Sequence, residues 1–161
     1  SEENVKEIPT KTLRNTQSYV TQETELFHDS IANNIAIGKP GAAREEIIKA
    51  AQKASIHDMI MSLPNGYDTE VGELGDTLSG GEKQRISIAR MILKNAPILI
   101  LDEAMAAVDS ENERLIGEAI DDLSKDKTII TIAHHLNTIR DSDQIIVMDK
   151  GVVLDAGAMK S

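Results

Sequence analysis

The chain has 161 residues, about the length of one domain and long enough to bury a substantial core. Its 17 basic and 27 acidic side chains leave a net charge of −10, which repels phosphate backbones and argues against nucleic acid as a partner. Cysteine is absent, which excludes disulfides and thiolate metal sites, and no apolar run approaches the roughly 20 residues that span a bilayer.

The first half of the chain predicts more helix than strand. A short strand is expected at residues 18–20, within an otherwise polar N-terminal stretch. Apolar residues at helical spacing predict one helix over residues 43–63, which Pro64-Asn65-Gly66 ends. Residues 68–77 are charged and rich in glycine and are expected to form a loop.

Two capping boxes predict helices in the second half. Ser79 and Glu82 have the spacing of a capping box ahead of an apolar stripe, and Ser110 and Glu113 have it again. Helices are therefore expected to start near residues 79 and 110.

Strands are expected between and after these helices. Continuous aliphatic runs at residues 98–101 and 128–132 are typical of strands that are buried on both faces. Two more strands are expected at 144–148 and 152–154, joined by a turn at Lys150-Gly151. The alternation of strands and helices predicts an α/β fold with a largely parallel sheet.

Polar residues at the carboxyl ends of two predicted strands are candidates for chemistry. Leu101 runs into Asp102 and Glu103, and Ile132 runs through an alanine into His134. Ligands of parallel α/β sheets bind beyond these ends, and two neighbouring carboxylates there can divide the work, one holding a hydrated Mg²⁺ and the other orienting a water. A solvated acidic turn explains the two carboxylates about as well, and a lone histidine is more often structural.

The predicted helix start at residues 79–81 is a candidate phosphate site. It presents free backbone N–H groups, the positive end of the helix dipole and two residues without side chains. On spacing alone, an ordinary capped helix is the better interpretation.

Taken together, these motifs closely resemble the nucleotide-binding domain of ATP-binding cassette transporters. The resemblance rests on Leu-Ser-Gly-Gly-Glu-Lys-Gln-Arg at 78–85, Ile-Leu-Ile-Leu-Asp-Glu-Ala at 98–104, Asp109 and Thr-Ile-Ala-His at 131–134, and it covers nearly the whole chain. It implies a P-loop NTPase core with a helical subdomain. The implied parts are a remnant of the core with the Q-loop at 1–27, the helical subdomain ending in the signature helix at 28–96, and the C-terminal part of the core at 97–161.

The resemblance implies ATP and Mg²⁺ as cofactors and assigns the strand-end residues to them. Asp102 matches the Walker B aspartate that supports Mg²⁺, and Glu103 matches the general base. His134 matches the switch histidine that contacts the γ-phosphate.

Other matched residues imply a partner subunit. Ser79, Gly80 and Gly81 match the signature loop that grips the γ-phosphate of ATP held by a second nucleotide-binding domain. Asp109 matches the D-loop aspartate that communicates across this dimer. Gln22 matches the Q-loop glutamine that contacts Mg²⁺ and the attacking water and senses the membrane domain.

The phosphate loop of such a domain, G-x-x-x-x-G-K-[ST], does not occur in this sequence. In the family it lies upstream of the Q-loop, and this chain begins 21 residues before Gln22. We therefore expect a partial domain that lacks its N-terminal strands and the loop, and that neither binds nor hydrolyses ATP alone. Its exposed sheet edges are expected to rearrange locally or to pair with a second copy.

Three segments resemble exporter-type domains, which are usually fused to membrane helices. They are residues 22–35, 63–67 and 69–73. The resemblance implies a permease domain as partner and a place at the cytoplasmic face of the membrane, with the chain itself soluble. A soluble cassette ATPase that acts on DNA or ribosomes is the alternative, and the acidic charge and these segments disfavour it. A pure interaction module describes the expected behaviour of the isolated chain, not of its parent.

Three positions depart from the family pattern. Met105 stands where threonine is usual, Val108 where leucine is common, and His135 where arginine usually follows the switch histidine. None of them is assigned to chemistry, so we expect the parent site to be catalytically competent.

Overall fold

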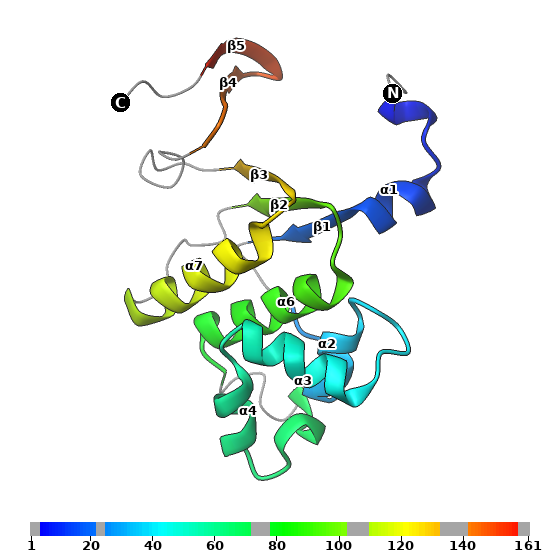
Figure 1. Cartoon of the computed structure of the whole chain (residues 1–161), viewed down its shortest axis with the longest axis vertical. Coiled ribbons are helices and arrows are strands. Elements are labelled where there is room, and N and C mark those ends of the chain that lie inside the picture. Colours follow the sequence, from blue (N-terminus) through cyan, green and yellow to red (C-terminus); the bar gives the residue numbers. More distant parts are fainter. Residues whose placement is uncertain (1–3, 22–24, 72–77, 103–109, 133–141, 158–161) are drawn as a thin grey trace.

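The computed structural model describes residues 4–21, 25–71, 78–102, 110–132 and 142–157. For residues 110–113 it describes the backbone alone. A helical part lies below a small sheet, and a hairpin stands beyond the sheet (Figure 1). The elements are η1 (Val5–Glu7), α1 (Thr10–Thr16), β1 (Gln17–Val20), α2 (Ile31–Ala36), α3 (Arg44–Lys53), α4 (His57–Ser62), η2 (Gly66–Asp68), α6 (Gly80–Lys94), β2 (Ile98–Asp102), α7 (Ser110–Ser124), β3 (Thr128–Ile132), β4 (Ile145–Asp149) and β5 (Val152–Gly157).

The central sheet has three parallel strands in the order β1-β2-β3, which confirms the predicted α/β class. One face of the sheet packs on α6 and α7. Its contact with these helices is a cluster of five buried side chains: Val20, Met91, Leu99, Leu101 and Leu123.

The prediction that the two aliphatic strands are buried on both faces is wrong. In β2 the buried residues Leu99 and Leu101 alternate with residues of intermediate exposure, so only one face is fully buried. In β3 every residue is exposed except Thr131, which is intermediate. A continuous aliphatic run predicts that other elements pack on both faces of the sheet. Within the described residues only α6 and α7 pack on it, and both lie on the same face.

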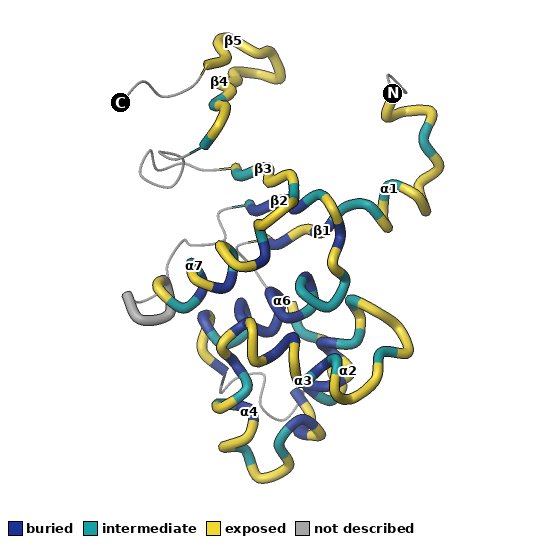
Figure 2. Tube along the Cα trace, in the orientation of Figure 1, coloured by how far each residue is buried: buried dark blue, intermediate teal, exposed yellow. Residues whose placement is uncertain are grey.

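The second and larger core lies in the helical part (Figure 2). It is built from isoleucine and alanine side chains of α2, α3, α4, α6 and α7, with Tyr67 as its aromatic member. Most of the fully buried large side chains belong to it. Helix α6 contributes side chains to both cores and so connects the sheet to the helices.

The expected helix over residues 43–63 is two helices, α3 and α4. Ser55 between them has a φ of 54°, in the left-handed region that ends a helix. The Ile56 N–H donates to the Ala51 carbonyl at 3.0 Å, which closes this C-terminal turn. The break aims α4 away from α3, and the buried Ile60 then packs in the same core.

The last two strands form an antiparallel hairpin, as predicted. Lys150 and Gly151 both have positive φ, 47° and 80°, which is the requirement of the primed turns that suit hairpins. Every residue of β5 is exposed, and within the described residues the hairpin pairs with no strand of the central sheet (Figure 2). None of the helices in the described part is long and apolar enough to cross a membrane.

Candidate functional site

The N-terminus of α6 has the capped geometry that the sequence predicts. The Ser79 hydroxyl accepts from the Glu82 N–H at 3.2 Å, and the Glu82 carboxylate accepts from the Ser79 N–H at 2.7 Å. Ser79 and Gly80 are exposed, whereas Gly81 is buried. Among the described residues, a Cβ added at Gly80 would meet nothing within 4 Å, so no described side chain crowds this position. The arrangement offers N–H groups and the positive helix end to an anion.

Asp102 is the last residue of β2 and has intermediate exposure. Its Oδ2 accepts a hydrogen bond of 2.9 Å from the Tyr19 hydroxyl on the neighbouring strand. This bond, followed by partial desolvation and by the charge of Asp102, raises the pKa of Tyr19, so the phenol stays protonated and remains a donor. Sequence reasoning missed Tyr19, because its partner lies 83 positions away and only the strand register connects them.

The donor set around Asp102 fits a magnesium ion that is shared with phosphates. The described residues contain no group of three or more acidic, histidine or cysteine side chains that could hold a metal by themselves. Magnesium usually keeps several waters and is bound through one or two carboxylates plus substrate phosphates. A single accessible strand-end carboxylate is the ligand that such a site needs.

The structure brings the ends of two strands together but leaves several predicted site residues outside its description. Asp102 lies opposite Ile132 in the parallel register of β2 and β3, so the chain leaves both strands at the same edge. The predicted site residues Gln22, Glu103, Asp109 and His134 lie outside the described residues.

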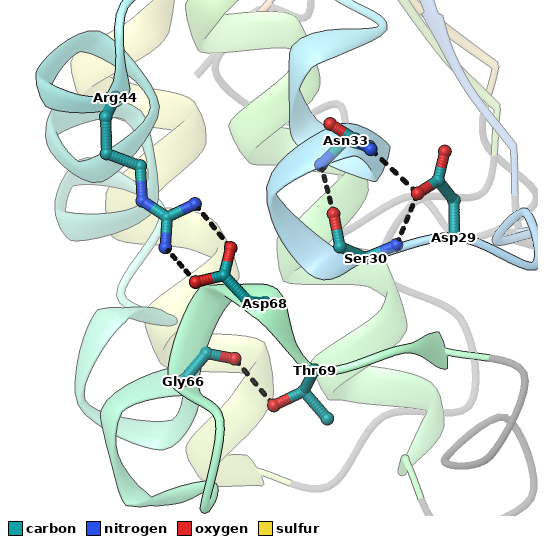
Figure 3. A network of polar contacts seen from close by, with 7 residues as sticks. All are labelled: Asp29, Ser30, Asn33, Arg44, Gly66, Asp68 and Thr69. Atoms are coloured by element: carbon teal, nitrogen blue, oxygen red, sulfur yellow. Dashed lines mark hydrogen bonds and ion pairs between the residues drawn. The ribbon is translucent and has the colours of Figure 1, made fainter.

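The three exporter-like segments meet in the helical part. The Ile31 N–H donates to the Thr69 carbonyl and the Val71 N–H donates to the Asp29 carbonyl, both at 3.0 Å. Figure 3 shows the polar side chains around this junction, with the Thr69 hydroxyl donating to the Gly66 carbonyl at 2.7 Å. Residues 29–31 are thereby paired with residues 69–71.

A second set of contacts holds the loop from η2 against α3. The Arg44 guanidinium forms a forked ion pair with Asp68, at 2.9 and 3.1 Å (Figure 3), and lies 5.1 Å from the centroid of the Tyr67 ring. The Tyr67 hydroxyl is 2.8 Å from His57 Nδ1. Burial raises the pKa of Tyr67 to about 12, although the charge of Arg44 opposes this.

An open hollow of about 350 Å³ lies beside the same junction. Phe27 and Ile37 line it and are 62% and 49% exposed, which leaves two large apolar side chains uncovered. Arg90 of α6 lies 5.9 Å from the centroid of the Phe27 ring and also donates to the Asn34 carboxamide, so it contacts two of the residues that line the hollow. Sequence reasoning quoted Phe27 as part of a pattern but missed Arg90.

Comparison with known proteins agrees with this architecture. The family model described as ABC transporter matches residues 1–106. A candidate multidrug export ATP-binding/permease protein of Bacillus subtilis is 53% identical over 153 residues, which are 95% of this chain and 26% of that protein. A protein of the same description from Staphylococcus aureus is 52% identical over 154 residues, 96% of this chain and 27% of that one.

A solved structure gives the same picture at the level of the fold. A bacterial Atm1-family ABC exporter with ATP bound superposes with a TM-score of 0.86 and 47% identity, and the match covers 96% of this chain and 27% of the exporter chain. This chain therefore spans about a quarter of the length of the relatives that it matches.

Proposed function

This chain belongs to the ABC transporter family, and we propose that it supplies the helical subdomain and the C-terminal part of the ATPase core to an exporter that couples ATP hydrolysis to transport. The relatives that support an exporter combine ATP-binding and permease parts in one protein. The proposal places the chain at the cytoplasmic face of a membrane. The parts are a Q-loop remnant at 1–27, the helical subdomain at 28–96 and the C-terminal core at 97–161.

The observation that carries the proposal is the open tip of α6. Ser79 caps the helix through its hydroxyl, and within the described residues nothing lies within 4 Å of a Cβ built at Gly80, which supports N–H groups and a helix dipole that face outward. We propose that Ser79, Gly80 and Gly81 bind the γ-phosphate of an ATP that a second nucleotide-binding domain holds. An ordinary cap has no need of two consecutive glycines, which lower helix propensity.

The chemistry is proposed to lie at the carboxyl end of β2. Asp102 would hold Mg²⁺, which when bound neutralises charge on the phosphates, and Glu103 would orient the attacking water. His134 would contact the γ-phosphate and Gln22 would contact Mg²⁺ and the water. The support for His134 is the register that brings the end of β3 beside Asp102. Asp109 is proposed to communicate across the dimer.

The partner proposed for the hollow at Phe27 and Ile37 is the permease part of the same transporter. The relatives are about four times longer than their match to this chain, so most of their length is outside it. Two exposed apolar side chains beside a rigid junction suit contact with a helix end from that permease. Replacing Phe27 by alanine is expected to lower transport more than ATP hydrolysis.

The isolated chain is proposed to be inactive toward ATP. Its sequence lacks the Gly-rich loop with lysine that cradles the phosphates, so Ser79 and Asp102 have no anchored nucleotide to act on. The exposed apolar side chains of β3, β4 and β5 are proposed to drive self-association of the chain. Calorimetry is expected to detect no micromolar ATP binding, and a micromolar dissociation constant would contradict this.

A chimeric transporter tests the proposed function directly. The 153 matched residues of the Bacillus subtilis relative are replaced by this chain, and ATP hydrolysis is measured in detergent and in vesicles. The chimera is expected to hydrolyse ATP, Glu103→Gln to bind ATP without hydrolysing it, and Asp102→Asn to lose Mg²⁺ binding and with it Mg²⁺-dependent hydrolysis. Asp126→Asn, at an exposed turn, is the matched control and is expected to retain activity.

Two results would contradict the proposal. One is a folded chimera that neither binds nor hydrolyses ATP. The other is a Glu103→Gln variant that hydrolyses at the unmodified rate. The comparisons give no support to a cassette ATPase that acts on DNA or ribosomes, since the relatives reported above are exporters by description.

A further inference from the structure

The hydrogen bond between Tyr19 and Asp102 is a feature that the proposed function does not use. Tyr19 lies opposite Ile100 in the parallel register of β1 and β2, and Asp102 is two residues further along the same face. Diagonal neighbours of this kind are within reach of an aromatic side chain. The register therefore brings the phenol within hydrogen-bonding distance of the carboxylate.

The bond occupies one oxygen of the carboxylate, and no described residue binds the other. Oδ2 accepts from the Tyr19 hydroxyl at 2.9 Å, and within the described part of the chain no contact is recorded for Oδ1. A hydrogen bond to one oxygen restricts rotation of the carboxylate about the Cβ–Cγ bond. The direction of Oδ1 is then limited, which favours its binding to a metal ion or to a water of that ion.

Packing does not account for Tyr19. The side chain is 51% exposed, belongs to neither buried cluster and lies on the sheet face that α6 and α7 do not cover. Its neighbour Val20, on the opposite face, is 1% exposed and belongs to the core. An aliphatic residue would serve a strand at position 19 equally well, and it would not contact Asp102.

We propose that Tyr19 is a positioning residue, whose hydroxyl orients the Asp102 carboxylate for Mg²⁺ bound with ATP. The inference rests on the proposed function, because it assumes that Asp102 is the metal ligand. Groups that hydrogen-bond to metal ligands fix their orientation, and their loss typically weakens metal affinity about 10- to 100-fold. Tyr19 itself touches neither the metal nor the nucleotide in this assignment.

The test measures metal binding apart from turnover. Mn²⁺ replaces Mg²⁺ in the chimeric transporter carrying Glu103→Gln, which holds ATP without hydrolysis, and free Mn²⁺ is followed by electron paramagnetic resonance. Tyr19→Phe is expected to weaken Mn²⁺ binding by about 10-fold or more. ATP binding in the presence of a chelator is expected to stay unchanged, because only the metal ligand is affected.

A matched control is available in the second tyrosine of the chain. Tyr67→Phe removes a phenol from the buried helical core, away from Asp102, and is expected to leave Mn²⁺ affinity unchanged. Thermal unfolding of Tyr19→Phe is expected to match that of the unmodified protein, because the ring stays in place and is half exposed. Should that variant unfold, Tyr19→Leu provides the same measurement without the hydroxyl.

The outcomes separate the two proposals. If the chimera with Tyr19 intact shows no ATP-dependent Mn²⁺ binding, or if Asp102→Asn does not reduce it, the assignment of Asp102 as metal ligand is wrong. If Asp102→Asn abolishes binding but Tyr19→Phe leaves it within about threefold, well below the usual effect of such a loss, the positioning role alone is wrong.

Discussion

The guanidinium of Arg90 and the carboxamide of Asn34 join α6 to α2 at the centre of the helical part. Arg90 Nη2 donates to Asn34 Oδ1 at 2.7 Å, and Arg90 Nε donates to the Asn34 carbonyl at 2.6 Å. Asn34 is fully buried, and its amide nitrogen donates to the carbonyls of Phe27, Asp29 and Ser30. One buried side chain thus ties α6 to the segment that precedes α2.

Asn34→Ala is expected to destabilise the chain by about 3 kcal/mol, because it leaves several buried polar groups without partners. Urea unfolding followed by circular dichroism measures the change. Asn65→Ala is the matched control, since Asn65 is exposed and makes no side-chain cap, and it is expected to change stability by less than about 0.5 kcal/mol. Equal effects of the two substitutions would contradict this account of the junction.

Gly38 makes a close approach to the same helix. A Cβ built there would lie 2.2 Å from the backbone carbonyl oxygen of Arg90, and backbone cannot move aside as a flexible side chain can. Gly38→Ala is therefore expected to cost more than about 2 kcal/mol in urea unfolding. Gly80→Ala, where the added methyl meets nothing within 4 Å, is expected to be neutral or slightly stabilising. A neutral Gly38→Ala would show that α2 and α6 do not pack this closely.

Stability is expected to fall at alkaline pH through both tyrosines. The hydrogen bond to Asp102 raises the pKa of Tyr19, and burial raises the pKa of Tyr67 to about 12, whereas the unfolded value is about 10. Since the folded values are the higher ones, the stabilisation is complete below about pH 10 and is lost as the pH rises toward 12.

Phenolate absorbance measures this titration without interference from tryptophan, which the chain lacks. The native chain is expected to show little phenolate near pH 10, and the chain in guanidinium about half of its full signal. Tyr67→Phe is expected to remove most of the loss of stability between pH 10 and 12. Identical titrations of native and unfolded chain would contradict the burial of Tyr67.

The sequence predicted correctly the helix start and the hairpin turn that interactions between neighbouring residues determine. Ser79 and Glu82 cap α6 reciprocally, as their spacing indicates, and Lys150-Gly151 forms the hairpin turn. The break at Ser55 escaped prediction, because neither glycine nor proline marks it and the apolar spacing continues across it. Its left-handed conformation is stabilised by the packing of α4 in the core, which is a tertiary effect.

The exposure of the strands and the contacts between distant residues could not be predicted from the sequence pattern. The aliphatic run of β3 predicts cover on both faces, yet exposure depends on which elements lie against the strand, and the described part leaves most of it open. The bond between Tyr19 and Asp102 needs the register of β1 on β2, which no local signal specifies. Of the candidate site, the motif positions were therefore predictable and their supporting contacts were not.

Ser79 has two proposed roles, and aspartate at this position separates them. As a helix cap, aspartate is about as good as serine, and its charge favours the positive end of the dipole. Ser79→Asp is therefore expected to keep the stability of α6 within about 0.5 kcal/mol, whereas Ser79→Ala is expected to cost about 1 kcal/mol in urea unfolding. As a phosphate contact, the order reverses, because the carboxylate repels the γ-phosphate and alanine only removes one hydroxyl. In the chimeric transporter, ATP-driven closure and hydrolysis are expected to fall in the order serine, alanine, aspartate.

If hydrolysis instead follows stability, with aspartate equal to serine, Ser79 is a cap alone and the open tip of α6 binds no phosphate.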